Sequence, residues 1–141
     1  MLLVDGDLRG PKLAKMLGVT PRKTLADVRK GACSAGEAAL PVPGCDGLSL
    51  VAGAKTEESP ADLFARGFGG FAADAGSSCD YLLVYAPAQS AYPDAGSLMA
   101  FSQGVVLNAK YGSTTYLALK NAVQDTAEAG GKIAGFVVSD V

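Results

Sequence analysis

Two carboxylates and one arginine directly follow the first apolar segment. Their types and spacing are suited to binding a metal ion or a phosphate. Residues 2–4 read Leu-Leu-Val, and Asp5, Asp7 and Arg9 come next. Carboxylate oxygens are hard ligands that suit Mg2+, and a guanidinium group pairs with phosphate oxygens. The pattern therefore permits a magnesium–phosphate site. The same residues also fit a helix-entry turn in which Asp7 caps the next helix and Arg9 is solvated, and spacing alone favours that turn.

A phosphate-cradling loop would follow the pattern Gly-x-x-x-x-Gly-Lys-Ser/Thr after a strand, and the sequence does not contain it. Residues 53–56, Gly-Ala-Lys-Thr, have the right types in the wrong order. Residues 130–133, Gly-Gly-Lys-Ile, lack the hydroxyl residue and precede a strand-like run. We interpret both segments as turns.

Tyr85 closes the apolar run 81–85, where a kinase or nucleotide hydrolase would place an aspartate to hold Mg2+. A phenol with a pKa of about 10 is neutral near neutral pH and binds Mg2+ poorly. We therefore interpret Tyr85 as a partly buried aromatic residue whose hydroxyl is bonded nearby.

The composition excludes several function classes. Twelve basic and fourteen acidic residues give a net charge of -2, so we expect no nucleic-acid partner. Histidine does not occur, which excludes histidine-based triads and histidine zinc sites. The three cysteines lack Cys-x-x-Cys spacing and predict reduced thiols. No apolar run approaches the roughly 20 residues that span a bilayer, so we expect a soluble chain without direct membrane insertion.

Short apolar runs alternate with helical patterns along the chain. The predicted strands cover residues 2–4, 48–51, 81–85, 104–107 and 133–138. The predicted helices cover residues 11–17, 24–28, 59–71, 94–101 and 114–129, with 31–47 mostly loop. Continuous apolar strands indicate burial on both faces, and intervening helices supply parallel crossovers. The fold class is therefore α/β, one domain over 1–141, with a mostly parallel sheet flanked by helices on both faces.

Residues 2–13, Leu-Leu-Val-Asp-Gly-Asp-Leu-Arg-Gly-Pro-Lys-Leu, resemble the second Walker-type motif (Walker A′) of bacterial tyrosine kinases. These kinases (BY-kinases) are deviant P-loop proteins related to MinD and ParA. The Leu-Arg-x-Pro continuation resembles the kinases more than the partitioning ATPases. Further similar segments follow in the family's order, at residues 24–28, 59–63, 79–87, 104–107 and 135–138.

The resemblance implies a P-loop NTPase-like fold with a remnant magnesium–nucleotide site at Asp5, Asp7 and Arg9. Asp5 and Asp7 would contact Mg2+ if the ion binds, or would activate an acceptor hydroxyl. Two departures stand out: the family's P-loop strand would precede Leu2 and is not in this sequence, and Tyr85 occupies the Walker B aspartate position. We therefore expect no bound cofactor and no catalysis by this chain.

The resulting hypothesis is a pseudokinase that acts as a partner or regulator in bacterial exopolysaccharide or capsule biosynthesis and export. By resemblance, its partner is a membrane-bound polysaccharide chain-length regulator, which would hold a cytoplasmic chain at the inner membrane, and a homo-oligomer is also allowed. One alternative is the C-terminal part of an active protein-tyrosine autokinase that uses Mg-ATP. A second alternative is a ParA- or MinD-like positioning ATPase.

Without the P-loop strand, the sheet has two ways to close. Either strand 2–4 pairs directly with strand 81–85, which we favour, or another chain supplies the strand. Direct pairing brings Tyr85 near Asp5, so that its hydroxyl can bond the carboxylate. We also expect no autophosphorylation on tyrosine, because Tyr81 and Tyr85 lie in a strand predicted to be buried and the sequence contains no tyrosine-rich tail.

Overall fold

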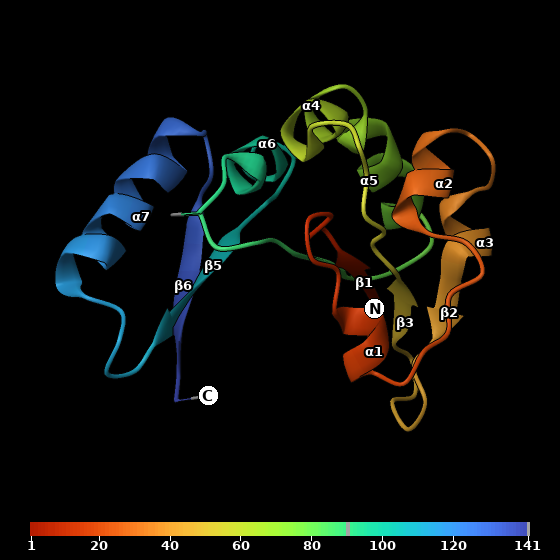
Figure 1. The fold of residues 1–141 in the computed structure, drawn as a ribbon, viewed down its shortest axis with the longest axis horizontal. Helices are drawn as coiled ribbons and strands as arrows, with labels where there is room; N and C mark the ends of the chain where they lie inside the picture. The colour runs from red at the N-terminus through yellow and green to blue at the C-terminus, as the bar shows by residue number, and fades with distance from the viewer. Residues whose placement is uncertain (90, 141) are drawn as a thin grey trace. The chain divides into compact units, whose positions relative to one another are not determined.

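The computed structural model describes residues 1–89 and 91–140, and the chain divides into two compact units, Met1–Pro87 and Ala88–Val141 (Figure 1). The first unit contains β1 (Leu2–Asp5), α1 (Leu13–Met16), α2 (Leu25–Arg29), α3 (Ala35–Ala38), β2 (Ala39–Pro41), β3 (Ser49–Val51), α4 (Pro60–Ala65), α5 (Phe68–Gly76) and β4 (Leu82–Tyr85). The second contains α6 (Asp94–Met99), β5 (Val105–Lys110), α7 (Tyr116–Glu128) and β6 (Ile133–Ser139). That residues 1–141 form one domain stays a prediction.

The first unit is built on a four-stranded sheet in the order β2-β3-β1-β4. The central strand β1 pairs in parallel with both β3 and β4, and β2 pairs antiparallel with β3. The β1–β4 register runs from Leu2 opposite Leu82 to Asp5 opposite Tyr85. The predicted direct pairing of strand 2–4 with strand 81–85 is therefore confirmed, as is a mostly parallel α/β sheet.

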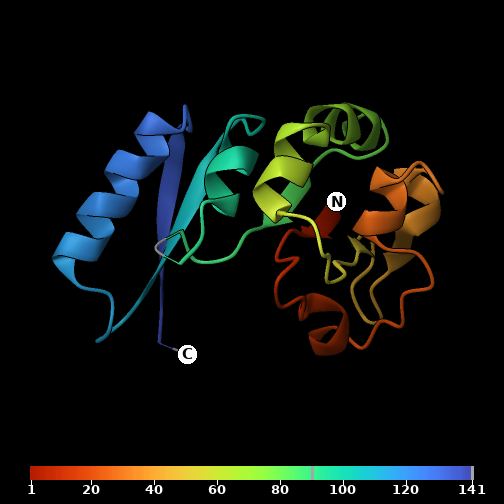
Figure 2. The same ribbon diagram turned by 45° about the horizontal axis from the view of Figure 1, so that its top comes forward.

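Helices cover both faces of this sheet, as the sequence predicts. On one face Leu3 and Leu50 pack with Leu13 and Leu17 from the α1 region. Because side chains alternate along a strand, Val4 and Val51 point to the other face, where both are fully buried. Helices α2 to α5 lie on that side, opposite α1 (Figure 2). The two covered faces hold β1 in place and so fix the position of the residues that follow it.

The segment 31–47 is mostly loop, as predicted, but it also contains the short helix α3 and the short strand β2, which were not predicted. Ser34 begins α3 with a capping box: its hydroxyl accepts the Glu37 N–H, and the Glu37 carboxylate accepts the Ser34 N–H. The strand β2 is stabilised by its antiparallel pairing with β3. The capping box was readable in the sequence, whereas a three-residue edge strand depends on its partner.

The predicted helix 59–71 is two helices, α4 and α5, separated at Gly67. Ser59 and Pro60 begin α4 as predicted, although the Ser59 side chain makes no capping hydrogen bond. A side chain at Gly67 would occupy the space of the Arg29 guanidinium group. The break therefore lies where the α2 side chain crosses the α4–α5 junction, and this tertiary contact was not visible in the helical pattern.

A second capping box begins α2 and gives a testable dependence of stability on pH. Asp27 accepts hydrogen bonds from the Thr24 hydroxyl and N–H, both at 2.8 Å, and these bonds lower the Asp27 pKa below its usual 3.8. A depressed folded-state pKa contributes stability above the unfolded value, which is lost as pH falls through the folded-state pKa. We expect Asp27→Asn to lower the urea midpoint near neutral pH and to match the parent below that pKa. A difference that persists in acid would contradict this.

The second unit is a parallel β5–β6 pair packed on α7, with α6 against α7. The Thr115 hydroxyl caps α7 by accepting the Ala118 N–H, and Gly130, with a φ of 79°, follows its end as predicted. The prediction that strand 133–138 is buried on both faces was wrong, because Phe136, Val137 and Val138 are each more than half exposed. In a pair with one covering helix, much of the strand surface remains open.

Candidate functional site

Asp5 ends β1 and organises the loop that leads into α1. Its side chain is fully buried, and its carboxylate accepts three backbone N–H groups. Oδ1 accepts the Asp7 N–H at 3.2 Å, while Oδ2 accepts the N–H groups of Lys12 at 3.1 Å and Leu13 at 3.0 Å. The carboxylate therefore ties both ends of the loop 6–12 to the end of the strand.

Asp7 makes a tighter turn inside the same loop. Its Oδ1 accepts the N–H groups of Arg9 at 3.2 Å and Gly10 at 3.0 Å. The helix-entry turn of the sequence analysis is thus present, but its roles differ. Asp5, and not Asp7, accepts the N–H groups at the start of α1, because the loop folds back over the end of β1.

The electrostatics of Asp5 reflect its burial. Desolvation raises its pKa above the usual 3.8, the N–H groups of Leu13, Asp7 and Lys12 lower it, and the Asp7 charge raises it slightly, for a net increase. Because the folded-state pKa lies above the unfolded value, ionised Asp5 costs stability near neutral pH, and this cost is relieved as pH falls through the folded-state pKa. Keeping the Asp5 carboxylate ionised in this buried position therefore reduces the free energy of unfolding.

Tyr85 lies opposite Asp5 in the β1–β4 register, and the Gly6 N–H donates to its carbonyl oxygen at 2.8 Å. The predicted hydrogen bond from the Tyr85 hydroxyl to Asp5 was wrong. The Asp5 carboxylate bonds backbone N–H groups instead, and the Tyr85 side chain is 44% exposed. Tyr81 is 73% exposed, so the expectation that both tyrosines lie in a buried strand was also wrong. An outer strand such as β4 leaves such side chains open to solvent.

Within residues 1–89 and 91–140, no group of three or more His, Cys, Asp or Glu side chains is placed to hold a metal ion. The structure does bring Asp5, Asp7 and Arg9 into one short loop, with Tyr85 on the neighbouring strand. Magnesium binding by Asp5 and Asp7 stays a prediction, and it would require Asp5 to exchange N–H partners for the ion.

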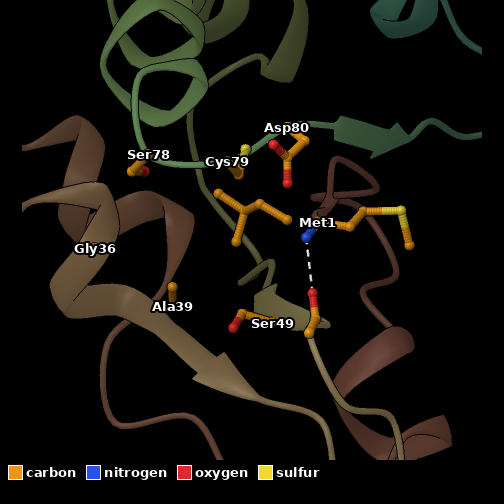
Figure 3. A pocket seen from close by; sticks show the side chains of 9 residues that line it. Met1, Gly36, Ala39, Ser49, Ser78, Cys79 and Asp80 are labelled. Atoms are coloured by element: carbon orange, nitrogen blue, oxygen red, sulfur yellow. Dashed lines mark hydrogen bonds between the residues drawn. The ribbon is translucent and has the colours of Figure 1, made fainter.

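Sequence reasoning missed Gly53, which follows β3 and at which a Cβ atom would lie 2.8 Å from the Asp5 carbonyl oxygen. It also did not find a hollow of about 380 Å³ at the other end of the sheet, beside Met1, Ser49, Cys79 and Asp80 (Figure 3). There the Met1 ammonium group donates to the Gly47 carbonyl at 2.7 Å. Because this hollow lies at the amino ends of β1, β3 and β4, it is separate from the Asp5 loop.

Comparisons with solved structures identify the fold. The kinase domain of VpsO matches with a TM-score of 0.90 and 21% identity, over 99% of this chain and 70% of that one. The kinase domain of Escherichia coli tyrosine kinase ETK matches with a TM-score of 0.90 and 21% identity, over 99% and 55%. The cell division ATPase MinD of Pyrococcus furiosus matches with a TM-score of 0.78 and 27% identity, over 97% and 58%.

No protein-family model matches the sequence. No curated protein matches it either. The chain nevertheless has the MinD/ParA-like deviant P-loop fold, and tyrosine-kinase domains are among its structural neighbours, as the sequence resemblance predicts. It spans 55% of the ETK kinase domain and 70% of the VpsO kinase domain.

Proposed function

We propose that this chain is a catalytically degenerate, tyrosine-kinase-like module that acts as a partner or regulator in bacterial exopolysaccharide or capsule export. The fold of the kinase domains supports the kinase-like part. The position of Tyr85 is the observation that supports the proposed loss of catalysis. It ends β4 in register with Asp5 at the carboxyl ends of parallel strands, which is where ligands bind in such sheets.

The chemistry at these strand ends argues against a working magnesium site. A kinase holds Mg2+ with carboxylates near the transferred phosphate. Here β4 offers a phenol, and β1 offers a carboxylate that already accepts three N–H groups. The second carboxylate of the loop, Asp7, likewise accepts two N–H groups of the loop, so neither carboxylate is free of hydrogen bonds to the chain itself.

The proposed partner is the membrane-bound polysaccharide chain-length regulator implied by the resemblance to bacterial tyrosine kinases. Among the described residues, no helix is both long and apolar enough to cross a membrane. Docking on such a partner would place the module beside the inner membrane on its cytoplasmic side. A homo-oligomer is compatible with this proposal, since a regulator can present several docking sites.

The competing proposal, part of an active autokinase, is favoured by two observations. The chain spans 55% of the ETK kinase domain, so a longer protein could carry further kinase elements. The five tyrosines are also all exposed, with 42% to 83% of each side chain open: Tyr81, Tyr85, Tyr92, Tyr111 and Tyr116. They could therefore serve as acceptors. The positioning-ATPase alternative has the MinD likeness in its favour.

Autophosphorylation of the full-length gene product, which under the autokinase proposal carries further kinase elements, separates the two kinase proposals. After incubation with MgATP, we expect mass spectrometry to find no phosphotyrosine on this chain, because β4 carries no acidic residue to hold the metal. As a control, an added active tyrosine kinase should modify the exposed tyrosines and show that they are accessible. A phosphotyrosine that forms in the full-length protein without any added kinase and disappears in Asp7→Asn would support the active autokinase instead.

A further inference from the structure

We infer that Asp5 and Gly53 are a pair of positioning residues that set the shape of the loop 6–12, rather than Asp5 serving as an open ligand. The inference uses the proposed function only for the loop's place in a remnant nucleotide site, and it holds whether or not ATP binds. The observations that carry it are the burial and hydrogen bonds of Asp5 and the close approach of Gly53.

The Asp5 carboxylate accepts hydrogen bonds from its own loop and from the first residue of α1. Three N–H donors at 3.0 to 3.2 Å come from Asp7, Lys12 and Leu13, and the side chain has no exposed surface. Each buried N–H needs an acceptor, because an unpaired one carries a desolvation penalty. One carboxylate therefore fixes both ends of the loop, and the Asp7 turn inside it holds the N–H groups of Arg9 and Gly10.

Gly53 makes room for this arrangement from the neighbouring strand. A Cβ atom at Gly53 would lie 2.8 Å from the Asp5 carbonyl oxygen, 3.3 Å from the Asp5 Cγ and 3.1 Å from the Pro11 Cβ. The first contact is with backbone, which cannot rotate away as a flexible side chain can. The end of β3 is itself held, because the Leu25 N–H donates to the Ala52 carbonyl at 2.8 Å. Any side chain at position 53 must therefore displace Asp5 and the start of the loop.

Gly10 provides a matched control within the same loop. A Cβ atom there would meet only the Asp7 Oδ2, at 3.9 Å, which is an ordinary contact, and the Gly10 φ is not positive. Gly10→Ala thus adds the same methyl group to the loop without touching Asp5. A difference between the two alanine variants reports on the contact and not on the loss of glycine.

Amide hydrogen exchange of the whole protein, followed by NMR, tests the inference. Asp5→Asn keeps the side-chain shape but replaces one acceptor oxygen by a donor. We expect the exchange of the Asp7, Lys12 and Leu13 amides to quicken by about tenfold or more, while the amides of β3 keep their protection. Gly53→Ala should quicken the same three amides, and Gly10→Ala should leave them within about twofold of the parent.

Three results would overturn the inference. Exchange that rises equally throughout the first unit in Asp5→Asn would indicate a general loss of stability. Unchanged exchange at Lys12 and Leu13 would show that the carboxylate does not hold the loop. Equal effects of Gly53→Ala and Gly10→Ala on exchange would show that the close approach of Gly53 to Asp5 does not shape the loop. None of these readings depends on nucleotide, so they stand apart from a failure of the proposed function.

Discussion

Phe64→Ala is expected to lower the free energy of unfolding of the first unit by about 3–5 kcal/mol, the usual cost of removing a buried phenylalanine. The Phe64 side chain is fully buried. Its ring meets that of Phe68 edge to face, with centroids 5.6 Å apart, and Phe68 meets Phe71 at 5.3 Å. Truncation therefore removes apolar contact, leaves a cavity and ends an aromatic pair between α4 and α5.

Urea unfolding followed by circular dichroism would measure this loss. Phe64→Leu fills most of the cavity and should lose less than Phe64→Ala. Met16→Ala, at a side chain that is 75% exposed, should stay within about 0.5 kcal/mol of the parent. A loss below about 1 kcal/mol for Phe64→Ala would contradict the packing described, because the site would then have to be loose enough to collapse.

The central part of the fold was predictable because its local signals agree with its tertiary role. The run 2–4 followed by Asp5 is both an apolar strand and the start of a recognisable motif, and it forms β1. The helix 114–129 has a hydroxyl residue before its first turn and glycine after its end, and it forms α7. Where propensity, capping and pattern point the same way, the sequence suffices.

The failures concern features that depend on a partner distant in the sequence. The strand β2 exists through its pairing with β3, and the break at Gly67 coincides with the Arg29 side chain. The burial of strand 81–85 was inferred from its apolar residues alone. The order β2-β3-β1-β4 places that strand at the outside, where Tyr85 remains 44% exposed.

The sequence predicted which residues lie together in the candidate site, but not which hydrogen bonds they make. Asp5, Asp7 and Arg9 do share one loop, and Tyr85 does lie opposite Asp5. The hydrogen bonds of Asp5 to the Lys12 and Leu13 N–H groups span seven and eight residues, and neither spacing is a recognised capping pattern. The close approach of Gly53 comes from another strand, so the sequence around Asp5 does not indicate it.

MgATP is expected to bind this protein with a dissociation constant no tighter than about 1 mM, corresponding to about -4 kcal/mol. Magnesium carries much of the affinity and orientation of a bound triphosphate. At the ends of β1 and β4, the ion would find a phenol from Tyr85 and a carboxylate already occupied by N–H donors. The other carboxylate of this loop, Asp7, also accepts two N–H groups of the loop, those of Arg9 and Gly10.

Tyr85→Asp tests the same argument by introducing an acidic residue at the end of β4. It places a carboxylate opposite Asp5, at the position where the resemblance expects the Walker B aspartate. If the phenol is what prevents binding, MgATP affinity should increase in this variant. Tyr85→Phe, which removes only the hydroxyl, should behave as the parent does, because that hydroxyl makes no hydrogen bond to Asp5 in the described structure.

Isothermal titration calorimetry of the protein with MgATP tests the central claim most directly, since it reads nucleotide binding without requiring turnover. The account predicts no saturable heat at micromolar ligand for the parent protein. A saturable isotherm with a dissociation constant in the low micromolar range, about -8 kcal/mol, would contradict it and would favour an active nucleotide site.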